Sequence, residues 1–66
     1  MKVSLNGELK ECPEGTTIEE LLDLYRIDKN RVAVELNLKI IPRKELHNQI
    51  LKDEDVLEVV TFVGGG

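Results

Sequence analysis

The segment Leu57-Glu58-Val59-Val60-Thr61-Phe62-Val63 leads directly into Gly64-Gly65-Gly66, the last three residues of the sequence. Its β-branched and aromatic residues predict a strand. Glycine has no Cβ and ranges widely in φ and ψ, so the triple glycine predicts a thin, mobile tail that can enter a narrow tunnel. If the chain has a reactive group, the Gly66 carboxylate is the best candidate. A frayed terminus or a remnant of cloning would have the same composition, so the rest of the sequence must decide.

Length and charge restrict the kind of protein that this chain can be. Its 66 residues suffice for one domain near the lower size limit for independent folding, with a net stability of about 3–5 kcal/mol. Hydrophobic residues make up 41% and charged residues 33%, which favours a folded globule over a disordered segment. The net charge of −4 disfavours nucleic-acid binding, and Tyr25 and Phe62 are too few aromatic residues for a base-stacking platform.

The sequence also points to a cytoplasmic location. Cys12 is the only cysteine, so no disulfide within the chain is possible, and a disulfide-free domain of this size is typical of a reducing compartment. Met1–Leu5 alternates between apolar and polar residues and does not form the apolar block of a signal peptide. No apolar run approaches 18 residues, so we expect no membrane span.

The residues needed for catalysis or metal binding are scarce. His47 is the only histidine and Ser4 the only serine, which argues against a histidine metal site and against a catalytic triad. The acids of Asp53–Asp55 are adjacent in a predicted turn and cannot easily converge on one cation, so we expect them to be solvated. The sequence therefore predicts no metal site and no enzyme active site.

The N-terminal residues predict a β-hairpin. Met1–Leu5 has period-two alternation, Asn6-Gly7 is a strong hairpin-turn signal, and a second strand follows from Glu8 to about Cys12. A two-residue loop places Cys12 inward and Leu9 outward, and a three-residue loop does the reverse. We prefer the two-residue loop because free cysteine is usually buried, although it leaves Leu9 exposed without a reason.

One helix and three further strands follow. Thr17 and Glu20 form a predicted capping box, and the helix ends by Arg26–Asp28. Its apolar stripe consists of Ile18, Leu21, Leu22 and Tyr25. The later elements are strands at Arg31–Leu36, Lys39–Ile41 and Val56–Val63, with a helical turn at Arg43–His47 from which Leu46 and either Ile50 or Leu51 pack inward. This order predicts an α+β fold, with one sheet packed on one main helix.

The last strand predicts a surface for a protein partner. If Leu57 and Val59 face the core, then Val60 and Phe62 face outward with Glu58. Ala33, on the outward side of its own strand, would lie nearby. We call Ala33, Val60 and Phe62 the docking patch and predict that it binds partners, because it adjoins the glycine tail. In the alternative arrangement Phe62 folds back onto the edge of the core.

The ordered motifs of the whole chain resemble those of the ThiS family of thiamine-biosynthesis sulfur carriers. The residues that resemble the family are Asn6-Gly7-Glu8, Thr17-Ile18, Leu21-Leu22, Val32-Ala33-Val34-Glu35-Leu36-Asn37, Ile41-Pro42-Arg43, Leu51-Lys52-Asp53, Asp55, Glu58-Val59-Val60 and Gly64-Gly65-Gly66. The resemblance implies a ubiquitin-like β-grasp fold, a mixed sheet of about five strands around one main helix. Residues 1–63 would form the domain and residues 64–66 the tail. The family often has glycine where this chain has Glu54, so we expect strain or another turn type there.

The resemblance implies a carrier that is a substrate of enzymes and is not itself an enzyme. An adenylating enzyme similar to ubiquitin-activating enzymes would use ATP and Mg to adenylate the Gly66 carboxylate. Sulfur from a donor such as a cysteine desulfurase would then give a thiocarboxylate, which thiazole synthase would consume. Gly64 and Gly65 would let the tail thread into both enzymes. The carrier itself would bind no cofactor.

Three other functions fit parts of the sequence. The small subunit of molybdopterin synthase has the same fold and a Gly-Gly end, but it is usually longer and fits Val32–Asn37 and Ile41-Pro42-Arg43 less well. A ubiquitin-like protein modifier would end in an isopeptide bond from Gly66 to lysine. A plain protein-binding module would use the glycines only as a flexible end.

Overall fold

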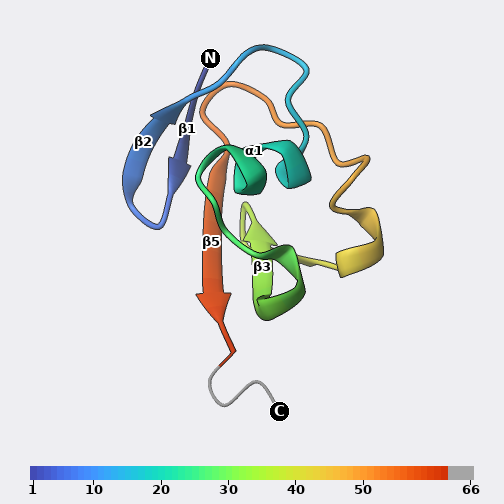
Figure 1. Ribbon diagram of the computed structural model, residues 1–66. Coiled ribbons are helices and arrows are strands. Elements are labelled where there is room, and N and C mark those ends of the chain that lie inside the picture. The colour runs from blue at the N-terminus through green and yellow to red at the C-terminus, as the bar shows by residue number, and fades with distance from the viewer. Residues whose placement is uncertain (63–66) are drawn as a thin grey trace.

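The computed structural model describes residues 1–62 and shows one sheet packed on one main helix (Figure 1). The strands are β1 (Lys2–Leu5), β2 (Glu8–Glu11), β3 (Val32–Leu36), β4 (Lys39–Ile41) and β5 (Val56–Thr61), the helix is α1 (Ile18–Leu24), and two 3₁₀ turns are η1 (Lys29–Arg31) and η2 (Arg43–Glu45). Val63, Gly64, Gly65 and Gly66 lie outside the described residues, so the domain boundary after residue 63 stays a prediction.

The five strands form one mixed sheet in the order β2-β1-β5-β3-β4. β1 and β5 are parallel, with Ser4 opposite Val56 and Leu5 opposite Leu57, and the other neighbouring pairs are antiparallel. The last strand of the chain is therefore the central strand of the sheet. This arrangement confirms the predicted α+β class and the mixed five-stranded sheet.

The first hairpin has the two-residue loop that the sequence favoured. Leu5 lies opposite Glu8, and the two turn residues, Asn6 and Gly7, have φ of 51° and 84°. Two consecutive residues with positive φ match the right-handed twist of the flanking strands. Cys12 is buried and Leu9 is 72% exposed, as this register requires.

Helix α1 begins with the predicted capping box. The Glu20 amide donates to Thr17 Oγ1 at 3.1 Å, and the Thr17 amide donates to Glu20 Oε1 at 2.9 Å. Two further amides of the first turn donate hydrogen bonds to carbonyl groups of the segment after β4. The Ile18 amide donates to Gln49 O at 2.9 Å, and the Glu19 amide donates to Leu46 O at 3.0 Å. A helix of seven residues is marginal alone, so these bonds and its packing must hold it in place.

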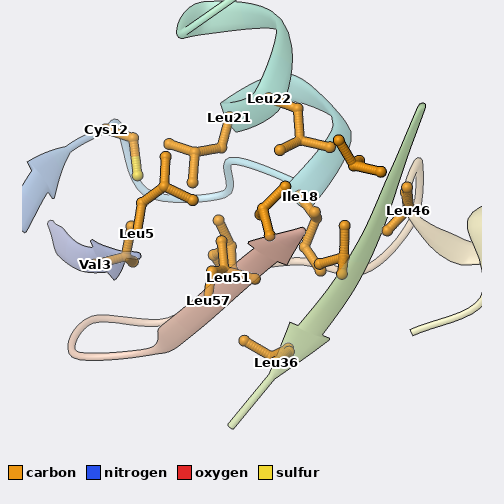
Figure 2. Close-up of a cluster of buried hydrophobic side chains, with 13 residues drawn as sticks. Val3, Leu5, Cys12, Ile18, Leu21, Leu22, Leu36, Leu46, Leu51 and Leu57 are labelled. Carbon is orange, nitrogen blue, oxygen red and sulfur yellow. The ribbon is translucent and has the colours of Figure 1, made fainter. Parts of the chain in front are cut away.

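The core lies between α1 and the inward face of the sheet (Figure 2). Its members are apolar side chains of α1, of the strands β1, β3 and β5 and of the connecting segments: Val3, Leu5, Cys12, Ile18, Leu21, Leu22, Val32, Val34, Leu36, Leu46, Leu51, Leu57 and Val59. The structure decides between the two candidates left open after η2, because Leu51 is buried and Ile50 is exposed. Alternate residues of β3 and β5 enter the core, which confirms the predicted inward faces.

The prediction that the acids of Asp53–Asp55 are all solvated is wrong for Asp55. Its side chain is only 6% exposed, and it accepts hydrogen bonds from the Lys52 amide at 2.7 Å and from Asn37 Nδ2 at 3.0 Å. These donors replace water and so remove most of the cost of burial. Asp53 instead accepts from the Lys2 amide at 2.8 Å, so the two carboxylates serve different parts of the chain.

Several element boundaries differ by one or two residues from those predicted. The second strand ends at Glu11 and not at Cys12, and Arg31 belongs to η1 and not to β3. The helical turn predicted at Arg43–His47 is the shorter η2. β5 ends at Thr61, two residues before the predicted end of the last strand.

We expect Glu54→Gly to stabilise the protein. Glu54 has φ of 72°, in the left-handed region that disfavours a side chain, and its amide donates to Lys2 O at 2.8 Å. Glycine adopts this conformation freely, so the free energy of unfolding should rise by about 0.5–1 kcal/mol in urea denaturation. Glu54→Ala is the matched control, because it keeps the Cβ and should give no such gain. Equal effects of the two variants would show that φ is not the cause.

Candidate functional site

The outward side of β5 presents the residues predicted for the docking patch. Leu57 and Val59 are 0% and 9% exposed, whereas Val60 and Phe62 are 63% and 50% exposed. This alternation confirms the predicted inward and outward faces of the strand. The exposure of Phe62 also argues against its folding back onto the edge of the core.

Ala33 completes the patch from the neighbouring strand. It is exposed and lies directly opposite Val60 in the β3–β5 pairing. The Phe62 amide donates to Arg31 O at 2.8 Å, which keeps the chain beside β3 for one residue after β5 ends. The structure thus places Ala33, Val60 and Phe62 together. Their role in partner binding stays a prediction, and Gly64, Gly65 and Gly66 lie outside the described residues.

Two carboxylates adjoin the patch on the same face of the sheet. Glu35 and Glu58 are directly opposite each other, two residue pairs along the strands from Ala33 and Val60. Like charges in this arrangement are destabilising by roughly 0.2–1 kcal/mol. A partner that covers this face would gain from placing a cationic side chain over the two acids.

The sequence analysis missed a further apolar residue on this face. Ile40 of β4 lies opposite Glu35 and is 76% exposed. The signal was present, because Ile40 precedes Ile41 in a short strand and only one of two consecutive residues can face the core. The outward face therefore has an apolar side chain beside Glu35 in the neighbouring strand, in addition to Ala33 and Val60 further along β3 and β5.

Asn6 fixes the position of the second half of β5. Its amide donates to Leu57 O at 2.9 Å, its side-chain Oδ1 accepts from the Val59 amide at 2.7 Å, and its Nδ2 donates to Val59 O at 3.1 Å. The carboxamide thus takes the place of the next residue of β1 in the ladder. The sequence analysis assigned Asn6 only to the turn, because nothing local indicates this long-range contact.

Residues 1–62 have further features outside the docking patch. Two shallow depressions have volumes of about 390 and 290 Å³, and their lining residues include no histidine, cysteine or serine.

A hydrogen bond joins η1 to α1. Lys29 of η1 donates to Glu19 of α1, and this contact raises the pKa of Lys29 above its usual value. Among residues 1–62 no helix is long and apolar enough to cross a membrane.

Comparison with known proteins gives a match along nearly the whole chain. Residues 3–66 match the ThiS family. The sulfur carrier protein ThiS of Bacillus subtilis strain 168 is 42% identical over 65 residues, covering 97% of this chain and 98% of that protein. A crystal structure of a thiamine biosynthesis protein (ThiS) from Geobacter metallireducens superposes with a TM-score of 0.84 at 30% identity, covering 100% of both chains. The predicted β-grasp fold is thereby confirmed.

Some similar proteins are much longer than this chain. The thiazole synthase of Paramagnetospirillum magneticum is 41% identical over 66 residues, which is 100% of this chain and only 20% of that protein. The chain therefore spans one fifth of that thiazole synthase. A segment resembling the complete chain is thus part of the same polypeptide as the rest of that protein.

We expect Asn6→Gly to destabilise the protein even though glycine suits the positive φ of this position. The variant removes both side-chain hydrogen bonds to Val59, so the free energy of unfolding should fall by about 1–3 kcal/mol in urea denaturation. Asn6→Ala should be worse, because it loses the same bonds and retains a Cβ at φ of 51°. If Asn6→Gly leaves the free energy of unfolding unchanged or raises it, the two side-chain hydrogen bonds to Val59 contribute nothing to stability.

Proposed function

This chain belongs to the ThiS family, and from that premise we propose that it is a sulfur carrier of thiamine biosynthesis. The observation that supports the proposal most strongly is the match over residues 3–66, which includes the glycine end. In this function the carboxylate of Gly66 is the reacting group. The whole-length match to ThiS proteins favours the thiamine pathway over the molybdopterin pathway.

The proposed chemistry begins with activation of the Gly66 carboxylate. A free carboxylate is a poor electrophile, so an adenylating enzyme would use ATP and Mg to join it to AMP, a good leaving group. Sulfide would displace AMP directly and leave a thiocarboxylate. Where a donor such as a cysteine desulfurase supplies the sulfur as a persulfide, displacement of AMP would give an acyl disulfide, and a thiol would then reduce it to the thiocarboxylate while itself forming a disulfide. Thiazole synthase would then take the sulfur. ATP and Mg belong to the partner enzyme, and the carrier holds no cofactor of its own.

The contribution of this chain is to present its end to each enzyme in turn. Gly66 is four residues after Phe62, so a fully extended tail reaches at most about 14 Å from the docking patch. A partner that holds the patch must therefore have its reactive centre within that distance. The absence of side chains at Gly64 and Gly65 keeps the tail narrow enough for an enclosed channel.

The partners that we propose follow from this route. They are an adenylating enzyme, thiazole synthase and a sulfur donor, and the second is supported by the thiazole synthase that contains a similar segment. We also propose a cytoplasmic location. The single cysteine, Cys12, is free and buried, and a small domain without a disulfide suits a reducing compartment.

We expect the chain to exchange one oxygen for one sulfur at Gly66 when it is incubated with the cognate adenylating enzyme, ATP, Mg and a sulfide source. Intact-protein mass spectrometry measures the change, and fragmentation places it on the last residue. The gain should disappear without ATP. A variant extended by one alanine after Gly66 is the matched control, because it keeps the fold and lacks the reacting carboxylate at that residue. An unchanged mass with a demonstrably active enzyme would refute the proposal.

We expect Val60→Asp and Phe62→Asp each to weaken binding to the adenylating enzyme at least about tenfold, because loss of an interface anchor typically costs 2 kcal/mol or more. Titration calorimetry measures the affinity. Their thermal stability should barely change, since both side chains are exposed. Leu57→Asp is the contrasting variant, because it buries a charge in the core and should unfold much of the domain. If Phe62→Asp melts the protein equally, the docking patch is misassigned.

A further inference from the structure

The backbone groups of β5 point alternately to its two neighbouring strands. Even-numbered residues bond to the β3 side, as in the bonds from Phe62 N to Arg31 O and from Asn37 N to Val56 O, both at 2.8 Å. Odd-numbered residues bond to the β1 side, as in the bonds from Ser4 N to Asp55 O and from Asn6 N to Leu57 O, both at 2.9 Å. The N–H and C=O of Thr61 therefore point to the β1 side.

Nothing in residues 1–62 pairs with Thr61 on that side. The β1–β5 pairing ends at Leu5 and Leu57, and the side chain of Asn6 extends it by one step to Val59. Figure 1 shows β5 continuing past the end of the β1–β2 hairpin. Thr61 is exposed, so its backbone groups form an open sheet edge immediately before Phe62 and the tail.

We propose that this open edge pairs with an extended backbone segment of thiazole synthase, which adds to the sheet beside β5. The inference rests on the proposed carrier function and names a contact for it. An unpaired edge is a template for strand addition, and Thr61 is an uncharged β-branched residue without the lysine or proline that protects many edges. The edge is continuous with the docking patch, so one partner surface can cover both.

Two observations favour thiazole synthase as the occupant over a second copy of this chain. In Paramagnetospirillum magneticum a segment similar to the whole chain is part of a protein named thiazole synthase, so the two are joined in one polypeptide there. Two copies of this chain would each have a net charge of −4 and would repel each other. Pairing at Thr61 would also set the direction in which the following residues enter the enzyme.

Thr61→Pro removes the amide donor at this edge and leaves the β3–β5 bonds intact, because Thr61 donates none of them. Proline is tolerated where a strand N–H faces solvent, and Val60 already has the extended conformation that a following proline requires. We expect the affinity for the cognate thiazole synthase, measured by titration calorimetry, to fall about tenfold. Thr61→Val is the matched control; it keeps the N–H and should bind within about twofold of the wild type.

Amide hydrogen exchange in the unaltered, ¹⁵N-labelled chain tests the same contact without a mutation. The Thr61 amide should exchange rapidly in the free protein and should become at least about tenfold slower when thiazole synthase is added. The Val60 amide is the internal reference, since it faces β3 and should be protected in both states.

The possible outcomes separate this inference from the proposed function. If Thr61→Pro binds thiazole synthase as tightly as Thr61→Val does, and the Thr61 amide stays unprotected in the complex, the strand addition is wrong. The carrier function still holds in that case, provided that the wild-type chain acquires sulfur. A dimer of the chain that is lost in Thr61→Pro assigns the edge to a second copy and also overturns the pairing with thiazole synthase. A chain that acquires no sulfur from an active adenylating enzyme refutes the carrier function itself.

Discussion

The parallel pairing of β1 with β5 is the contact on which the rest of the structure depends. It places Leu5 opposite Leu57. Forming this pairing therefore closes a loop that contains most of the residues of the chain. Such a non-local contact is costly in chain entropy, and the complete burial of Leu57 offsets that cost. Because β5 is held on both sides along most of its length, the position of Phe62, which follows it, is also fixed.

Two asparagines in tight turns supply the bonds that the strands cannot make with one another. Asn6 and Asn37 have φ of 51° and 50°, a conformation that asparagine tolerates better than most residues. The carboxamide of Asn6 bonds to Val59, and Asn37 Oδ1 accepts from the Val56 amide at 2.9 Å. Asn37 therefore supplies a hydrogen-bond partner at the start of β5, and Asn6 supplies partners in its second half. Each turn residue both reverses the chain and completes the ladder of the central strand.

The two faces of the sheet have different physical tasks. The inward face is filled by the core under α1, and a domain of 66 residues has little stability to spare there. The outward face instead exposes Ile40 and Val60 and places Glu35 opposite Glu58, an arrangement that does not stabilise the isolated chain. Exposed apolar side chains near an acidic pair are expected on a face that a partner protein covers when it binds.

The sequence by itself determined the features that depend on local spacing. The alternation along residues 57–62 separated inward from outward side chains, the capping box located α1, and Asn6-Gly7 located the turn of the first hairpin. Tertiary structure alone decided that Asp55 is buried, that the side chain of Asn6 reaches Val59, and that Thr61 has an open edge. The physical reason is that side-chain direction repeats every two or about 3.6 residues along the chain. The partner of a hydrogen-bonding group, by contrast, depends on which distant strand happens to end beside it.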